Sequence, residues 1–493
     1  MSQHPVDPEH EHEELDEDAQ LEEEDIVEVH EDDGDEPMDE DEDDDREYDG
    51  EIVIGGPANE EEEQMMRDFE AEDNAWGGSS LHKSQQSIFA IALHPNFPNP
   101  PLAISGGEDD QGFIFCPIPA NPDEEASSSS SFSSDSFPAV KLTGHKDSVV
   151  AAAWNFDGEM VATGGMDGHV RVWRRVKGSR RNSEEAAGVA DSMDSWKKWE
   201  FLTDLDASSE VQWLSWHPKG NVLAAGCEDS VVWLWSLPKG ENLTVLSSHT
   251  LTSTCGIFPP PNGRQLLTTS LDSTLVLWEV STSTPIFKTS VFVAPNSPEL
   301  DPGTDGITSL AVSPNGQIAA VGGAAGGVKL VNLPKGDVVQ TLQGHKEGES
   351  VEALVFVDLL SGAGGGKGVV LVSGGTDGKG FVWDVNTGRV RAELQHEDAI
   401  TSISPHPAPH LHLVTSASAD GCLKTWDIRT GALIATHKGH LGIVNGVAVA
   451  RAPPRVEGDA KMDGTQLSAP GQGVIDQVII SAGDEGVSLI WRI

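Results

Sequence analysis

The sequence has few basic residues and no long apolar run. It carries 31 Lys and Arg against 81 Asp and Glu, which gives a formal net charge of −50 over 493 residues. Duplex binding requires a basic face that displaces counterions, so a direct nucleic-acid binder is not expected. A membrane-spanning helix needs about 18 consecutive apolar residues, and no segment approaches that length. We therefore expect neither nucleic acid nor a membrane as a direct partner.

Cysteine is also scarce. The four cysteines are Cys116, Cys227, Cys255 and Cys422, with no C-x-x-C pair among them. Such wide spacing argues against a zinc site or a disulfide framework and is typical of a reducing compartment. The first fourteen residues are acidic and lack the basic and apolar regions of a secretory signal. We expect a cytoplasmic protein, with the nucleus as a second location, and no metal or cofactor.

The negative charge is concentrated near the N-terminus. Residues 1–74 hold 36 acidic and two basic side chains, including the run DEDEDDD from Asp39 to Asp45. Such a segment cannot bury enough apolar surface to offset its chain entropy. We expect a disordered tail over residues 1–73 and one folded domain over residues 74–493. The tail either keeps the protein soluble by self-repulsion or acts as a polyanion that competes for a basic partner.

From Trp76 onward, short β-rich runs alternate with turns rich in Gly, Asp, Asn and Ser, which predicts an all-β fold. One frame, seen in MDGHVRVW, recurs along this region. Its clear copies end at Trp173, Trp235, Trp278, Trp383, Trp426 and Trp491, and two weaker copies end at Phe115 and Val331. The two shortest spacings between copies are 43 residues, close to the ~40–45 residues of a WD repeat.

An acidic residue lies six positions before the final residue in every copy except that of Val331, which has Ala325. A hydroxyl usually lies four residues earlier, and a histidine lies further upstream. This pattern resembles the WD-repeat family. The resemblance implies a β-propeller in which His, Ser or Thr, Asp and Trp form a hydrogen-bonded tetrad in each blade. The expected tetrads are His145, Thr163, Asp167 and Trp173; His249, Thr268, Asp272 and Trp278; His345, Ser373, Asp377 and Trp383; and His396, Ser416, Asp420 and Trp426.

His145, Thr163 and Asp167 have the residue types of a hydrolase triad. The same trio recurs in several copies, however, and a catalytic set has no reason to repeat around a ring. A buried carboxylate in a tight turn needs hydrogen-bond partners, and the imidazole and the turn amides supply them. We therefore expect structural tetrads, no catalytic residue and no enzymatic activity.

Eight copies predict eight blades, with seven as the alternative because the Val331 copy is degenerate. The frame forms the third strand of a blade in the usual register, and the last copy ends two residues before Ile493. The final blade therefore lacks an outer strand. We expect residues 74–82 to pair with the terminal strand and close the ring, which protects its edges.

Five insertions are rich in Ser, Gly, Pro or charge and are expected to be exposed loops. They span Asn121–Pro138, Val176–Lys198, Ala294–Asp305, Leu359–Lys367 and Arg451–Gly473. The basic run from Arg174 to Arg181 is interpreted as part of such a loop.

The loops of one face, the top face, carry more acids than the tetrads need. This face comprises the turns between the second and third strands and the connections that precede each inner strand. Its candidate partner-binding acids are Glu108, Asp110, Asp147, Glu210, Glu228, Asp305, Glu349 and Asp398. Convergent carboxylates at a channel mouth favour a cationic ligand, and Trp213 and Trp233 could add a stacking surface for it. The alternative is a set of scattered surface acids on an acidic protein.

The opening SGGEDDQGFIF, followed by LTGHKDSVVAAAW, resembles one WD-repeat subfamily. It contains the animal angio-associated migratory cell protein and a fungal ribosome-assembly factor that chaperones large-subunit ribosomal protein L-ten. The resemblance implies a monomeric chaperone whose acidic top face holds the basic N-terminal segment of that ribosomal protein, nascent or free, and delivers it to the large subunit. Two alternatives are a WD-repeat scaffold in signalling or cell migration and an acidic-tailed histone chaperone.

Overall fold

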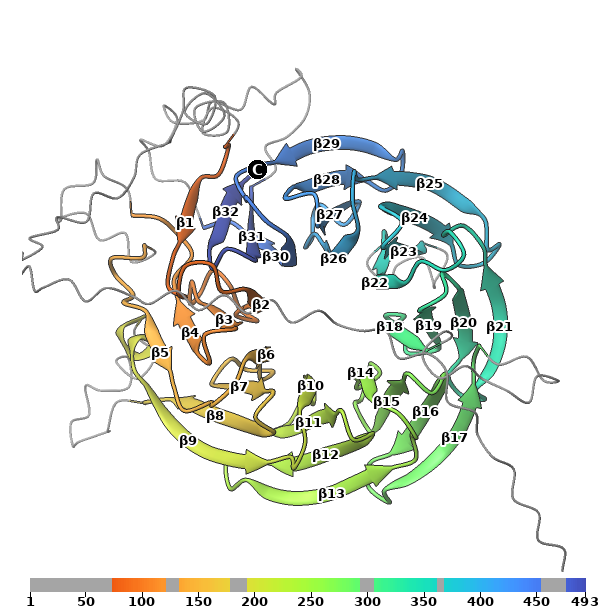
Figure 1. The fold of residues 1–493 in the computed structure, drawn as a ribbon, viewed down its shortest axis with the longest axis horizontal. Helices are drawn as coiled ribbons and strands as arrows, with labels where there is room; N and C mark the ends of the chain where they lie inside the picture. Colours follow the sequence, from red (N-terminus) through yellow and green to blue (C-terminus); the bar gives the residue numbers. More distant parts are fainter. Residues whose placement is uncertain (1–72, 121–132, 178–192, 293–305, 361–367, 454–475) are drawn as a thin grey trace, which may run out of the picture. The chain divides into compact units, whose positions relative to one another are not determined.

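The fold consists of eight four-stranded antiparallel sheets arranged in a ring (Figure 1). The structure is a computed structural model and describes residues 73–120, 133–177, 193–292, 306–360, 368–453 and 476–493. The acidic segment before residue 73 lies outside these residues, so its predicted disorder and its boundary with the folded domain stay predictions. No helix within the described ranges is long and apolar enough to cross a bilayer.

The first four blades follow the chain order from inner to outer strand. They consist of β2 (Ile88–Leu93), β3 (Ala103–Gly107), β4 (Gly112–Phe115) and β5 (Val140–Leu142); β6 (Val149–Trp154), β7 (Met160–Gly165), β8 (His169–Arg175) and β9 (Trp199–Asp206); β10 (Val211–Trp216), β11 (Val222–Cys227), β12 (Val231–Ser236) and β13 (Glu241–Ser247); and β14 (Ser253–Ile257), β15 (Gln265–Ser270), β16 (Thr274–Glu279) and β17 (Thr284–Ser290).

The other four blades repeat this order, except that the last takes its outer strand from the N-terminal side. They consist of β18 (Ile307–Val312), β19 (Ile318–Gly323), β20 (Val328–Asn332) and β21 (Asp337–Leu342); β22 (Val351–Asp358), β23 (Val369–Gly375), β24 (Lys379–Asp384) and β25 (Val390–Gln395); β26 (Ile400–Pro405), β27 (Leu413–Ser418), β28 (Leu423–Asp427) and β29 (Ala432–His437); and β30 (Val444–Arg451), β31 (Gln477–Gly483), β32 (Ser488–Arg492) and β1 (Gly77–Ser79).

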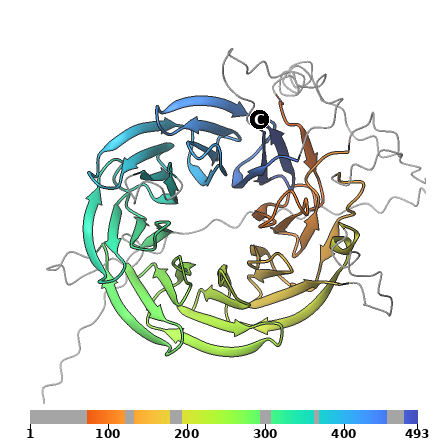
Figure 2. The same cartoon turned by 180° about the vertical axis from the view of Figure 1, so that it is seen from behind.

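Neighbouring inner strands contact one another around the whole ring, and β30 returns to contact β2 (Figure 2). The eight-blade prediction is confirmed, and the seven-blade alternative is wrong. The degenerate copy forms a complete blade because pairing needs the alternation of buried residues and not a tryptophan. Val331 pairs with Ala319 as Trp173 pairs with Val161, and it is fully buried.

Strand β1 is the fourth strand of the last sheet. Gly77 lies opposite Ile490 and Ser79 lies opposite Ser488. Asn74 adds side-chain bonds, because its Oδ1 accepts from the Trp491 indole at 3.0 Å and from the Lys438 amide at 2.9 Å. The pairing lies within the segment 74–82 that the sequence pointed to. That this strand is what holds the ring closed stays a prediction.

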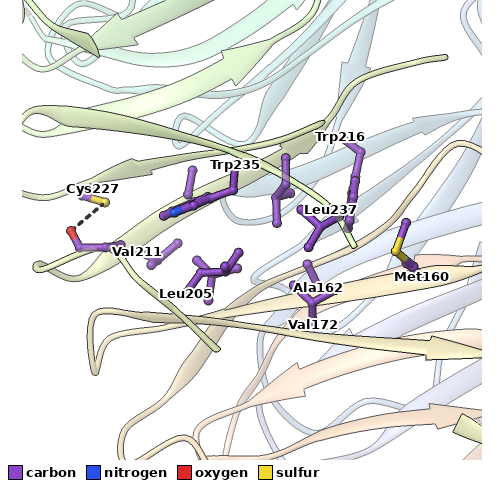
Figure 3. Close-up of a cluster of buried hydrophobic side chains, with 13 residues drawn as sticks. Met160, Ala162, Val172, Leu205, Val211, Trp216, Cys227, Trp235 and Leu237 are labelled. Atoms are coloured by element: carbon purple, nitrogen blue, oxygen red, sulfur yellow. Dashed lines mark hydrogen bonds between the residues drawn. The ribbon is translucent and has the colours of Figure 1, made fainter. Parts of the chain in front are cut away.

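The hydrophobic core lies between adjacent blades. Figure 3 shows the cluster where Met160, Ala162 and Leu205 of the second blade face Trp216 and Trp235 of the third. Because each blade buries one face against each neighbour, the strands are apolar on both faces and the blades hold one another in place. Burial in this cluster raises the pKa of the Cys227 thiol to about 12, so the thiol stays protonated.

The expectation that the insertions are exposed loops is wrong at some of their ends. Phe137 is buried between the first and second blades. Met193–Lys197 forms a 3-10 helix, η2, whose Trp196 packs against the same cluster. The Arg175 guanidinium stacks 3.8 Å above the Trp196 ring and makes a bidentate pair with Glu159. Aromatic residues inside a polar insertion therefore anchor its ends to the core.

Candidate functional site

The top face is formed by two kinds of loop, which antiparallel pairing brings to the same end of every blade. One is the turn between the second and third strands, and the other precedes each inner strand. A backbone hydrogen bond joins the two in every blade. The Glu108 amide donates to the Ser87 carbonyl at 2.8 Å, and the Glu228 amide donates to the Glu210 carbonyl at 2.9 Å. Side chains on the two loops are therefore held close together.

Below these loops, the tetrads hold the turns in place. In the sixth blade, His345 Nδ1 lies 3.1 Å from Asp377 Oδ1, and His345 Nε2 lies 2.8 Å from Ser373 Oγ. The Trp383 indole donates to the same hydroxyl at 2.8 Å. A carboxylate can only accept, so Nδ1 carries the imidazole proton and Nε2 accepts from the serine.

Of the other three expected tetrads, one repeats this arrangement and two depart from it. His396, Ser416, Asp420 and Trp426 repeat the arrangement of the sixth blade in full. In the second blade, His145 bonds to Asp167 and Thr163, and Trp173 is buried in the core. In the fourth blade, His249 bonds to Thr268 at 2.8 Å and reaches Asp272 through the Thr274 hydroxyl, which lies 2.7 Å from Nδ1.

Two further networks were not among the expected tetrads. His82 Nδ1 lies 2.8 Å from Asp109, and Nε2 lies 2.9 Å from Ser105. In the last blade, His440 bonds to Glu485 and Ser481. The sequence signal that could have identified His82 is its position at the end of residues 74–82. This segment corresponds to the one before the second blade, which ends at His145. In the third blade Ala225 occupies the hydroxyl position, and in the fifth Ala325 occupies the acidic position.

The electrostatics of the tetrads suit support and not catalysis. Burial lowers the pKa of His145 and His345, so both imidazoles are neutral near pH 7. Burial alone would raise the pKa of Asp377, but the Lys346 amide and the His345 imidazole hold that pKa below its usual range. The Thr163 and Ser373 hydroxyls are fully buried, so a substrate cannot reach them.

A pH dependence of stability follows from buried histidines elsewhere in the ring. Burial lowers the pKa of His94 and His406 to about 4 and that of His437 to about 3. The unfolded chain binds protons near pH 6.5 that the folded protein does not, so the stabilisation is complete above that pH and is lost on acidification. For His406 alone, the free energy of unfolding should fall by about 2 kcal/mol at pH 5. Below about pH 4 the depressed pKa of Asp420, about 2, adds a second loss. Urea midpoints measured across this range check the prediction, and a constant midpoint between pH 7 and 5 contradicts it.

All seven candidate acids within the described ranges lie on the top-face loops, and Asp305 lies outside them. Five of the seven belong to the three consecutive blades 1 to 3, so they are not evenly spaced around the mouth. These five are Glu108, Asp110, Asp147, Glu210 and Glu228; Glu349 belongs to the sixth blade and Asp398 to the seventh. Each of the seven is exposed or half-buried.

The seven acids differ in their partners. The Lys346 ammonium lies 3.0 Å from Glu349, the Thr376 hydroxyl donates to the same carboxylate, and these contacts lower the pKa of Glu349. Among the described residues, neither Glu210 nor Glu228 has an ion-pair partner. Of these seven acids, those without an ion-pair partner among the described residues are the five of blades 1 to 3 and Asp398.

The sequence analysis missed one acid at the channel, and it expected more exposure of two tryptophans than the structure shows. Glu352 is an exposed acid at the second position of β22 and was missed, although the residue after a buried strand start faces away from the core. Trp213 is 8% exposed, and its indole donates to Ser253 at 3.1 Å. Trp233 stacks on Trp235 and is half-buried against the core. Trp213 therefore offers little ring surface to a cation, and the stacking role expected of the two tryptophans stays a prediction.

The sequence and the fold are similar to those of known WD-repeat proteins. The family model "WD domain, G-beta repeat" matches residues 137–174, 240–279, 299–332 and 388–427. The chain is 26% identical to the Angio-associated migratory cell protein of Homo sapiens, over 85% of this chain and 86% of that protein. It is 30% identical to an uncharacterized WD repeat-containing protein of Schizosaccharomyces pombe, over 79% and 84%.

A more distant relative is Ribosome assembly protein SQT1 of Saccharomyces cerevisiae, 24% identical over 90% of this chain and 93% of that protein. The crystal structure of Chaetomium thermophilum Sqt1 bound to the N-terminus of the ribosomal protein L10 superposes with a TM-score of 0.62. It is 24% identical and covers 86% of this chain and 100% of that one. Repeated blades with buried tetrads define a β-propeller scaffold whose top-face loops are available for binding. The chain belongs to the WD-repeat family.

Proposed function

We propose that this protein chaperones a basic large-subunit ribosomal protein by holding its N-terminal segment on the acidic top face. Handover to the assembling large subunit then releases the client, without a chemical step. We place this activity in the cytoplasm and treat the protein as a monomer. The names of two relatives support the client class, since one is a ribosome assembly protein and the other was crystallised with a ribosomal-protein N-terminus.

The observation that carries the proposal is the uncompensated charge on blades 1 to 3. Glu210 and Glu228 lie on adjoining loops joined by one backbone bond, and neither has an ion-pair partner in the described part of the chain. Carboxylates of one sign on a shared face attract a cationic chain and raise its association rate. Ribosomal proteins are strongly basic, so masking their charge prevents indiscriminate RNA binding before assembly.

The test is binding of the full chain to a fluorescent N-terminal peptide of the large-subunit ribosomal protein L10. We expect tight binding at about 50 mM salt that weakens at least tenfold at about 300 mM, because the contacts are ionic and screened. Co-purification from translating cells should recover the same ribosomal protein. Recovery of cytoskeletal or signalling proteins in its place would favour the scaffold alternative, which the resemblance to the Angio-associated migratory cell protein keeps open. Recovery of histones would favour the second alternative, an acidic-tailed histone chaperone.

A further inference from the structure

A cavity of about 310 Å³ opens in the channel beneath the top face, enough for roughly ten waters. It is lined by the inner strands β2, β6, β10, β26 and β30, at their second to fourth residues. Inner strands start at the top face, so the cavity lies in the upper half of the channel. Its lining is mixed: the apolar side chains of Phe89, Ile91, Leu214 and Val447 lie beside the polar side chains of Gln212, Ser402 and Asn445, and no charged side chain is among the described residues that line it.

The cavity lies directly below the acids of blades 1 and 3. Phe89, which is 38% exposed, follows Ser87 by two residues, and the Ser87 amide donates to the Glu108 carboxylate at 2.9 Å. Gln212 lines the cavity two residues after Glu210. A chain bound to the acids would therefore pass over an uncharged opening.

Two further large apolar side chains are exposed in the loop that precedes β30, one of the strands lining the cavity. Leu441 and Ile443, in the loop before β30, are 76% and 41% exposed. The Ile443 carbonyl accepts from the Asp484 amide at 2.9 Å, and the Asp484 carboxylate accepts from the Ser87 hydroxyl. Large apolar side chains exposed together at a concave surface commonly mark a binding site.

We infer that the cavity takes a bulky apolar side chain of the same basic segment that the acidic loops hold. The inference rests on the proposed function and specifies its ligand as a peptide whose cations flank an apolar residue. Charge complementarity places the peptide over the opening. An ammonium or guanidinium group entering the cavity would give up part of its hydration without meeting a carboxylate on its walls, whereas removing an apolar side chain from water against Phe89 is favourable.

The test compares the full chain with three variants, using the ribosomal-protein peptide as the probe. Phe89→Ser removes an apolar wall, and Phe89→Leu keeps it. Phe156→Ser is the matched control, because Phe156 is 42% exposed and lies between β6 and β7 on the opposite face. Phe89→Ser should weaken binding about tenfold, by an equal factor at low and high salt, and the other two should stay within about twofold.

The peptide supplies an independent arm. Replacing its bulky apolar residues by serine, one at a time, keeps its charge. One of these replacements should weaken binding to the wild-type chain about tenfold. The same replacement should weaken binding to Phe89→Ser much less, because the two changes remove the same contact. A wild-type chain that does not bind the peptide would refute the proposed function itself. Salt-sensitive binding that is equal in Phe89→Ser and Phe156→Ser, or indifferent to every apolar replacement, would overturn only this inference.

Discussion

Reversing the charge of Glu210 and Glu228 to lysine should weaken binding of the basic peptide about 25-fold at low salt. Both side chains lack an internal cation among the described residues, so each reversal removes one attraction and adds one repulsion. At an exposed position this change amounts to about 1 kcal/mol, or roughly fivefold, per site. Peptide anisotropy at two salt concentrations measures the loss, and the slope of affinity against salt should become shallower.

Two comparisons make this result specific to the site. Asp337→Lys with Glu279→Lys changes the net charge equally at strand ends on the opposite face, and it should leave affinity within about twofold. Glu349→Lys should cost less than either top-face reversal of blade 3, because Lys346 already neutralises Glu349. Equal losses in the top-face and opposite-face variants would show that only the overall charge matters, and the site assignment would be wrong.

The blades could be predicted because their determinants are local. The turn before each third strand requires a left-handed backbone, and Gly168 and Gly378 adopt it at φ +76° and +71°. Ser230 and Ser273 adopt the same conformation at equivalent positions. The repeat alignment identifies these positions even though serine replaces glycine there. Alternation and turn chemistry therefore specify each sheet even where a tetrad residue is missing.

The candidate site was less accessible to prediction because it depends on neighbours from different blades. Trp213 is buried since Gly226 and Gly256 leave room for its indole; a Cβ at either glycine would lie about 2 Å from the ring. Gly256 belongs to the next blade, so no local sequence pattern predicts this contact. The pairing of Glu349 with Lys346 and the uncharged cavity below the acids likewise emerge only from the folded ring.

The largest effect on stability is expected from Asp377→Ala. This substitution removes the acceptor for His345 Nδ1 and for the Lys346 and Lys379 amides. The imidazole proton would then be buried without a partner, which costs the desolvation of that group as well as the lost bonds. We expect the free energy of unfolding to fall by about 3 kcal/mol, measured from urea denaturation of the purified protein.

Asp229→Ala is the matched control, because Asp229 occupies the same position in a blade without a tetrad. Its carboxylate is exposed, and the one hydrogen bond that it accepts from the described residues comes from the Val231 amide, at 3.1 Å. The control should lose less than about 1 kcal/mol, since its turn stays solvated. Peptide affinity should change little in Asp377→Ala if the tetrad only supports the loops, so a large loss of stability with retained binding separates support from recognition. Asp229→Ala is compared for stability alone, because its carboxylate adjoins Glu228 on the acidic face. Equal destabilisation by the two substitutions would mean that the turn carboxylate matters everywhere and that the imidazole network contributes nothing of its own.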